Sequence, residues 1–331
     1  MVDVRQINEE NLRAAEAFAR LLSMDGAWYT AQEVDDFAHN CGLTSHEAFL
    51  LLVSATLGME NDRAWISRYL SPAVTALSPQ PFVNNAYCHA LVFPEVSKGR
   101  WQFTHLSYAP YQLFPCGHMR LNDEGREIPL LGYFTVPFSY PAVLENGREW
   151  MTVTPNEIAT MAGPLAAARG QIAVFGLGLG YFALMASEKK EVASVTIIER
   201  DRDVVSLFLD HLLSQFPHRE KIRIVQSDAF SYLAGPMAKE EYDFAFVDLW
   251  HDVGDGIDMY LRCRKMERLS PCTIFQYWIE QDMLIFLRSL MIDDILNRAG
   301  KLDKLVSVSP EALTLSLTRD LALRVTPEDV K

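Results

Sequence analysis

The sequence predicts an α/β fold with a doubly wound, mostly parallel β-sheet, preceded by a helical N-terminal segment and a small β-rich segment. The first observation is a glycine-rich turn that joins a short buried strand to a helix. The second is that four predicted strands are each followed by a glycine or an acid; they begin near Ile172, Ala193, Ile222 and Tyr242. Because parallel strands end at one edge of a sheet, where ligands bind in such folds, the sequence predicts a binding edge there.

The glycine turn lies at residues 176–180. Val174 and Phe175 close an apolar run, Gly176, Gly178 and Gly180 form the turn, and 181–188 reads as a helix. Glycine has no Cβ, so such a loop can bring backbone N–H groups and a helix N-terminus close to a ligand.

Acids follow the next predicted strands. Strand 193–198 ends at Glu199, about twenty residues after the glycine loop, where a carboxylate can accept both hydroxyls of a ribose. Strand 221–225 is followed by Asp228 and Ala229, and strand 242–247 by Asp248. Together with the loop, these acids predict an adenosine-containing cofactor.

Residues 171–280 resemble the class I S-adenosylmethionine-dependent methyltransferases, whose fold is Rossmann-like, and within that superfamily the spermidine synthase-like branch. Motif I matches 174–180, the ribose acid matches Glu199, the adenine-side pair matches Asp228-Ala229, and the motif after strand four matches Val247-Asp248. The resemblance implies S-adenosylmethionine as cofactor. The residues expected to hold it are Gly176, Leu177, Gly178, Gly180, Glu199, Arg200, Asp228, Ala229 and Asp248.

The expected function is methyl transfer to a small-molecule acceptor by direct displacement at the sulfonium methyl. One alternative is aminopropyl transfer from decarboxylated S-adenosylmethionine to a polyamine, and a further one is a non-catalytic cofactor-binding protein. Aminopropyltransferases carry Asp-x-x-Asp-Pro after strand four, whereas this chain reads Asp-Leu-Trp-His-Asp at 248–252. That departure favours methyl transfer.

The segment after the fourth strand contains the candidate chemistry. Asp248, His251 and Asp252 are the candidate catalytic residues, because His251 or Asp252 could take a proton from an attacking amine or hydroxyl. Trp250 offers an aromatic face to a cation or a planar acceptor. The structural alternative is that the aspartates of this segment form a solvated loop and the first turn of a helix, where acids favour the positive end of the dipole.

Tyr181 and Glu157 are further candidate substrate contacts. Glu157 also fits a purely structural pattern, because Thr154, Pro155 and Glu157 read as N-cap, N1 and N3 of a helix. Both roles for Glu157 stay open.

Several other classes are disfavoured. A dinucleotide fold spaces its glycines as Gly-x-Gly-x-x-Gly, and the third glycine here comes one residue early. Residues Cys88, His89, His105, Cys116 and His118 lack zinc-finger spacing, and Glu-Gln-Asp at 280–282 departs from the magnesium-dependent catechol-type pattern, so no metal is expected. Residues 1–80 contain five Lys or Arg against eleven Asp or Glu, which disfavours DNA binding by the short N-terminal helices.

Composition sets the remaining expectations. The 331 residues are 49% hydrophobic and 22% charged, as in globular proteins, and the net charge of −13 argues against nucleic acid while tolerating a cationic acceptor. Five scattered cysteines, a polar start and no long apolar run predict a cytoplasmic protein without a membrane partner.

Three segments are expected along the chain. Residues 1–78 read as helices, including 11–24, one capped by Thr30 with Glu33, and one opened by Ser45 over 47–57; they form a lid, a packing module or a homodimerisation element. Residues 79–154 read as short strands, with runs 90–93, 101–108 and 130–136 and an Asn146-Gly147 hairpin turn, and are expected to cover the substrate. Residues 155–331 form the cofactor domain.

Overall fold

A computed structural model describes residues 4–23, 26–301 and 315–322. The contacts divide the chain into two compact units. Unit 1 comprises Met1–Pro79, Ser107–Ser139 and Leu284–Thr318, and unit 2 comprises Gln80–Leu106, Tyr140–Met283 and Arg319–Lys331. The three-segment division made from the sequence stays a prediction.

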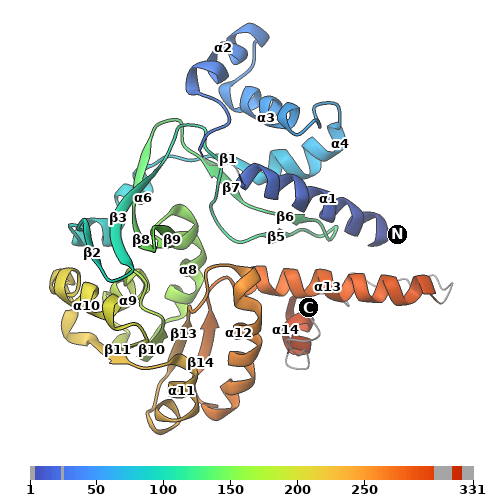
Figure 1. Cartoon of the computed structure of the whole chain (residues 1–331). Helices are drawn as coiled ribbons and strands as arrows, with labels where there is room; N and C mark the ends of the chain where they lie inside the picture. The colour runs from blue at the N-terminus through green and yellow to red at the C-terminus, as the bar shows by residue number, and fades with distance from the viewer. Residues whose placement is uncertain (1–3, 24–25, 302–314, 323–331) are drawn as a thin grey trace. The chain divides into compact units, whose positions relative to one another are not determined.

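A five-stranded sheet forms the centre of unit 2 (Figure 1). Its order is β12-β11-β10-β13-β14, and all four neighbouring pairs are parallel. The strands are β10 (Gly170–Phe175), β11 (Val192–Glu199), β12 (Ile222–Gln226), β13 (Phe244–Val247) and β14 (Ile274–Tyr277). The predicted mixed α/β architecture with a parallel sheet is therefore confirmed.

Helices connect these strands. They are α8 (Pro155–Ala167), α9 (Tyr181–Ser187), α10 (Arg202–His211), α11 (Ala229–Ala234) and α12 (Val253–Met266), with single 3₁₀ turns at Leu213–Gln215, Arg219–Lys221, Pro236–Lys239 and Glu267–Leu269. Helix α8 packs against α9, and α11 packs against α12. Every residue of β13 is buried, as expected for a strand covered on both faces.

A four-stranded sheet of order β2-β3-β8-β9 precedes α8. Its strands are β2 (Val96–Lys98), β3 (Trp101–Tyr108), β8 (Phe138–Glu145) and β9 (Arg148–Thr152). The predicted hairpin turn is confirmed: Glu145 pairs with Arg148 across Asn146 and Gly147, whose φ angles are 51° and 79°. Two positive φ angles at the centre of a two-residue loop match the right-handed twist of the strands.

One predicted strand is wrong. Residues 90–93 are not a strand, because the chain from Gln80 forms two short helices, α6 (Gln80–Val83) and α7 (Ala86–Ala90). Asn85 caps α7 through its side-chain oxygen, which accepts the Tyr87 N–H at 2.9 Å. The helix that Asn85 begins ends at Ala90, and residues 91–93 form neither helix nor strand.

Unit 1 contains most of the N-terminal helices. They are α1 (Val4–Leu22), α2 (Ala31–Cys41), α3 (Ser45–Thr56), α4 (Arg63–Trp65), a π-helical turn (Ile66–Leu70) and α5 (Ser71–Ala73). Short strands add β1 (Val74–Ala76), β4 (Phe114–Pro115), β5 (Arg120–Leu121), β6 (Glu127–Ile128) and β7 (Leu131–Tyr133). The division into units falls within α13 (Glu280–Lys301) and α14 (Leu315–Ala322).

The caps of α2 and α3 follow one pattern. Thr30 and Glu33 form the predicted capping box of α2. The start of α3 is shifted by one residue from the prediction, because Thr44, rather than Ser45, caps it in a second box with Glu47. Both threonines precede an acid by three residues, which is the spacing that lets each side chain bind the other residue's backbone N–H.

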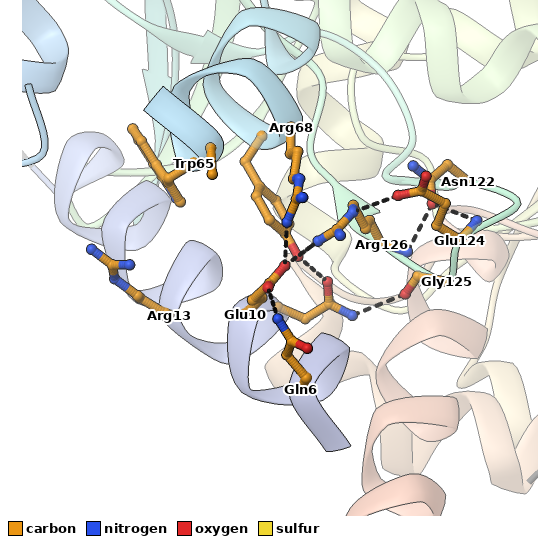
Figure 2. Close-up of polar contacts among 12 residues, drawn as sticks. Gln6, Glu10, Arg13, Trp65, Arg68, Asn122, Glu124, Gly125 and Arg126 are labelled. Atoms are coloured by element: carbon orange, nitrogen blue, oxygen red, sulfur yellow. Dashed lines mark hydrogen bonds and ion pairs between the residues drawn. The ribbon is translucent and has the colours of Figure 1, made fainter. Parts of the chain in front are cut away.

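A buried arginine joins three parts of unit 1 (Figure 2). The side chain of Arg126 is 8% exposed and binds Glu10 of α1, Glu124 at 2.8 Å and the Tyr69 hydroxyl at 3.1 Å. Asn11 adds a hydrogen bond to the Gly125 carbonyl at 3.0 Å. Because the buried guanidinium is paired with acids, the β5–β6 turn is fixed against α1.

No helix among residues 4–23, 26–301 and 315–322 is long and apolar enough to cross a membrane.

Candidate functional site

The five parallel strands of unit 2 end at one edge, which we call the carboxyl edge. Hydrogen bonds continue the ladder there: the Asp248 N–H donates to the Phe175 carbonyl at 2.9 Å, and the Gly176 N–H to the Ile198 carbonyl at 3.0 Å. Strand β10 is central, and the chain continues to β11 on one side and to β13 on the other. Ligands in open α/β sheets bind at this kind of switch in strand order.

The glycine loop follows β10 at this edge. Gly176, Gly178 and Gly180 have φ angles of 97°, 49° and 74°, which side chains rarely adopt. An added Cβ on Gly176 would overlap the Asp248 carbonyl oxygen, and one on Gly178 would overlap the Met151 sulfur. The protein's own packing therefore requires these glycines, whatever the loop binds.

Two residues that sequence reasoning missed support the loop. The Tyr87 hydroxyl donates to the Leu179 carbonyl at 2.7 Å, and the Asn85 amide donates to the Tyr181 hydroxyl at 3.2 Å. Tyr181 itself is 2% exposed, at the start of α9. Nothing in the local sequence marks α7 as a partner of the loop, because about ninety residues separate them.

Glu199 ends β11 beside the glycine loop. Its Oε2 accepts the Leu177 N–H at 3.2 Å, and its Oε1 accepts the Asp201 N–H at 2.8 Å. Burial raises the pKa of Glu199, although these N–H groups partly oppose the shift. Each carboxylate oxygen has a second lone pair, so Glu199 can also accept hydroxyl groups from a ligand. Arg200, the next residue, is exposed.

Asp228 follows β12 and caps α11. Its Oδ1 accepts the Ser231 N–H at 2.8 Å, and this hydrogen bond lowers the pKa of Asp228, with help from the charges of Arg262 and Arg200. Ala229 is buried in the first turn of the helix. Capping accounts for one oxygen of Asp228, so the structural role coexists with any contact to a ligand.

Asp248 follows β13, next to Gly176. The side chain keeps partial exposure to solvent, yet the protein that surrounds it raises its pKa to about 7. A carboxyl group that titrates near neutrality is typical of a site that binds or transfers charge.

Glu157 lies in the first turn of α8 and faces the same region. Helix α8 reaches the carboxyl edge because the Trp278 indole, after β14, donates to the Thr160 hydroxyl at 2.9 Å. Glu157 is 8% exposed, and its Oε2 has no hydrogen-bond partner in the part of the chain that the structure describes. Burial, followed by the charges of Asp248 and Glu149, raises the pKa of Glu157 well above its usual range.

Glu149 completes this group, which we call the carboxyl cluster: Glu149, Glu157 and Asp248. Glu149 is exposed, but the protein around its carboxyl group raises its pKa, while the charge of His251 lowers it. Thr154 stands at the N-cap position of α8, but its side chain makes no capping hydrogen bond with the described residues. Glu157 therefore lies in the first turn of α8, as predicted from the sequence. Its carboxyl group is also acted on by the charges of two other acids, Asp248 and Glu149.

The residues of the loop after Asp248 differ in exposure and in their contacts. Trp250 is buried, and its indole N–H has no partner among residues 4–23, 26–301 and 315–322. His251 is exposed, and its ring lies 6.2 Å from that of Trp150. Asp252 caps α12 in a capping box with Asp255, with Oδ1 accepting the Gly254 N–H at 2.6 Å.

The structure thus brings the candidate residues together in two groups. The loop, Glu199 and Asp228 lie along the carboxyl edge from β10 to β12, and the carboxyl cluster, Trp250 and His251 lie toward β13 and β9. Asp252 caps α12 through Oδ1, and its Oδ2 lies 3.7 Å from His251 Nδ1, so the capping role coexists with the predicted catalytic one. No three His, Cys, Asp or Glu side chains of the described residues are arranged to hold a metal ion.

No protein-family model matches this chain, and no curated protein matches it. Among solved structures, it is similar to a spermidine synthase from Thermotoga maritima, with 13% identity, 48% of this chain and 60% of that chain covered, and a TM-score of 0.33. It is also similar to a proposed SAM-dependent methyltransferase from Streptococcus mutans, with 14% identity, coverage of 56% and 50%, and a TM-score of 0.34. In both cases the match spans less than two thirds of the solved chain.

Proposed function

We propose that this chain is an S-adenosylmethionine-dependent methyltransferase that acts on a small-molecule acceptor with a positive charge. One observation supports the cofactor above the others: the Glu199 carboxylate accepts the Leu177 N–H of the glycine loop at 3.2 Å, at the switch in strand order. This geometry puts an acid that can accept hydroxyl groups beside a loop in which three of five residues are glycine.

The charges along the carboxyl edge fit this cofactor better than a phosphate-containing one. Glu199, Asp228 and Asp248 are acids on three strands, and like charges would repel a pyrophosphate. S-adenosylmethionine has no phosphate, and its sulfonium is positive. Glu199 would hold the ribose hydroxyls, and Asp228 would lie on the adenine side.

When bound, the cofactor supplies a methyl group activated by a positive sulfur. The chain has to align the acceptor with that carbon, and such orientation can contribute about 7–11 kcal/mol. The carboxyl cluster would attract a positively charged acceptor, and the buried Trp250 would offer it an aromatic face. Asp248, whose pKa is about 7, can accept a proton from a protonated acceptor.

Aminopropyl transfer to a polyamine is the second candidate function. The carboxyl cluster favours it, because three acids, one of which has an oxygen (Glu157 Oε2) with no hydrogen-bond partner among the described residues, suit a substrate with several ammonium groups. Comparing the affinities of S-adenosylmethionine and its decarboxylated form by isothermal titration separates the two. Tighter binding of the decarboxylated form would move the assignment to aminopropyl transfer.

Titration of the Glu199→Gln variant with S-adenosylmethionine tests the cofactor assignment. Loss of a charged hydrogen-bond acceptor should weaken binding by about 10- to 100-fold. Glu191→Gln is the matched control, because Glu191 is exposed and precedes the opposite end of β11, and it should bind like the wild type. Full affinity in Glu199→Gln, or no binding by the wild type, would contradict the proposal.

Turnover is tested separately. The wild type should release S-adenosylhomocysteine with at least one acceptor from a panel of amines, phenols and small acids. Cofactor binding without turnover on any of them would support the non-catalytic alternative instead.

A further inference from the structure

Arg100 lies in the turn between β2 and β3 and binds two acids from distant parts of unit 2. Its Nη2 is 2.6 Å from Asp201 Oδ2, and its Nε is 2.6 Å from Glu145 Oε1. Asp201 precedes α10, and Glu145 ends β8. One planar guanidinium therefore bridges a helix of the parallel sheet and the β8–β9 hairpin.

On the helix side, the contacts of Arg100 extend through Asp201 to Glu199, the acid proposed to bind the ribose. Asp201 uses Oδ1 to cap α10, accepting the Asp203 N–H at 2.9 Å, and leaves Oδ2 to Arg100. Its backbone N–H donates to Glu199 Oε1 at 2.8 Å. Arg100 thus acts on the residue that fixes one oxygen of Glu199.

On the hairpin side, the bridge leads back to the glycine loop. The Asn146 N–H of the hairpin turn donates to the Arg100 carbonyl at 2.8 Å, so backbone and side chain of Arg100 both hold the turn. Strand β9 then carries Met151, whose sulfur fills the space beside Gly178, and Trp150, whose ring faces His251. The glycine loop thus contacts Glu199, which is connected through Asp201 to Arg100. Arg100 in turn binds the hairpin, which returns to the glycine loop at Met151.

We infer that Arg100 is a positioning residue that couples the β8–β9 hairpin to the nucleotide half of the site. Occupation of Glu199 by a ribose restrains the hairpin, and a restrained hairpin holds Glu199 ready for the cofactor. This inference rests on the proposed function, since it needs an adenosyl ligand at Glu199. The two effects must be equal in free energy, because binding linkage is reciprocal.

Lys98, the last residue of β2, provides a control for Arg100. Lys98 also reaches α10, where it binds Ser206 and lies 3.7 Å from Asp210. Both Lys98 and Arg100 are about half exposed, at 43% and 47%, so each pair contributes little to stability. Arg100 differs in its partners, which are Asp201 and Glu145 rather than residues farther along α10.

Three variants of the full chain test the inference: Arg100→Gln, Glu145→Gln and the control Lys98→Gln. S-adenosylmethionine affinity is measured by isothermal titration. Hydrogen exchange of a peptide covering residues 143–152 is then measured by mass spectrometry, with and without saturating cofactor. Circular dichroism and the thermal midpoint establish that each variant is folded.

The wild type should exchange more slowly in this peptide when the cofactor is bound. Arg100→Gln should weaken cofactor binding about fivefold or more and lose the protection of the hairpin at saturation. Glu145→Gln, which breaks the bridge only on the hairpin side, should also lose the protection and, because linkage is reciprocal, weaken cofactor binding by up to the same factor as Arg100→Gln. Lys98→Gln should behave like the wild type in both measurements.

Normal affinity and normal protection in Arg100→Gln would overturn the inference and leave the proposed function standing. An equal loss in Lys98→Gln would also overturn it, because the effect would then belong to the whole turn. If Arg100→Gln is unfolded, protection retained in Glu145→Gln refutes the coupling by itself. No binding of S-adenosylmethionine by the wild type would refute the proposed function and the inference together.

Discussion

The carboxyl group of Asp248 should destabilise the folded protein at neutral and alkaline pH, and Asp248→Asn should remove that effect. Burial raises the pKa of Asp248 from 3.8 to about 7. The pKa of Asp248 is thus higher in the folded protein than in the unfolded chain. Protonation of Asp248 therefore stabilises the folded protein, and this effect is complete when the pH is below the unfolded pKa. The effect is lost as the pH rises through 7.

The size of the effect follows from the shift. A shift of about three pKa units corresponds to a change of about 4 kcal/mol in the free energy of unfolding. About two thirds of this change occurs between pH 5 and pH 8. Asp248 keeps partial exposure, so solvent screening reduces the expected change to about 2 kcal/mol. Asparagine stays neutral throughout, so the free energy of unfolding of Asp248→Asn, relative to the wild type, should rise by about 2 kcal/mol from pH 5 to pH 8.

Urea unfolding at pH 5, 6, 7 and 8, followed by tryptophan fluorescence, measures this difference. The control is Asp228→Asn: a hydrogen bond from the Ser231 N–H lowers the pKa of Asp228, and asparagine can also cap α11. Its difference from the wild type should stay constant over this pH range, because Asp228 is ionised throughout. A pH-independent difference for Asp248→Asn, or one of opposite sign, would refute the reasoning.

Two further predictions concern unit 1. Arg126→Met should lower the free energy of unfolding by about 1 kcal/mol in urea, because it removes the hydrogen bond to the Tyr69 hydroxyl and the ion pairs to Glu10 and Glu124, which are themselves partly exposed; an unchanged midpoint would contradict the role of this network (Figure 2). Thr44→Ala should cost about 1 kcal/mol by removing the cap of α3, whereas Ser45→Ala at the neighbouring position should cost less; equal costs would mean that Thr44 is not the cap.

Local signals in the sequence were sufficient for several elements. The Asn146-Gly147 turn, the Thr30 capping box and the glycine loop were all predicted where they occur, because the residues that decide each conformation are within a few positions of one another. The one-residue shift of the cap from Ser45 to Thr44 also has a local cause. Serine and threonine are both good N-cap residues, so the two signals differ by a fraction of the energy of one cap.

The carboxyl cluster shows what local patterns miss. The sequence predicts Glu157 at the third position of a helix and also names it as a candidate substrate contact. The structure has Glu157 in the first turn of α8, and it also buries the carboxyl group where the charge of Asp248, about ninety residues away in the chain, acts on it, with Oε2 unpartnered among the described residues. Asp252, a candidate for proton transfer, also caps α12, and its catalytic role stays a prediction.

The sequence by itself determined the parallel α/β sheet and the acid or glycine at the ends of four of its strands, because period, turn residues and strand-ending residues act over short distances. Only the tertiary structure decided that Asp248 acts on the buried Glu157 and that Arg100 bridges Glu145 and Asp201, which lies 101 positions from Arg100 in the chain. Burial and long-range pairing depend on how strands order themselves in space, and no short stretch of residues contains that information.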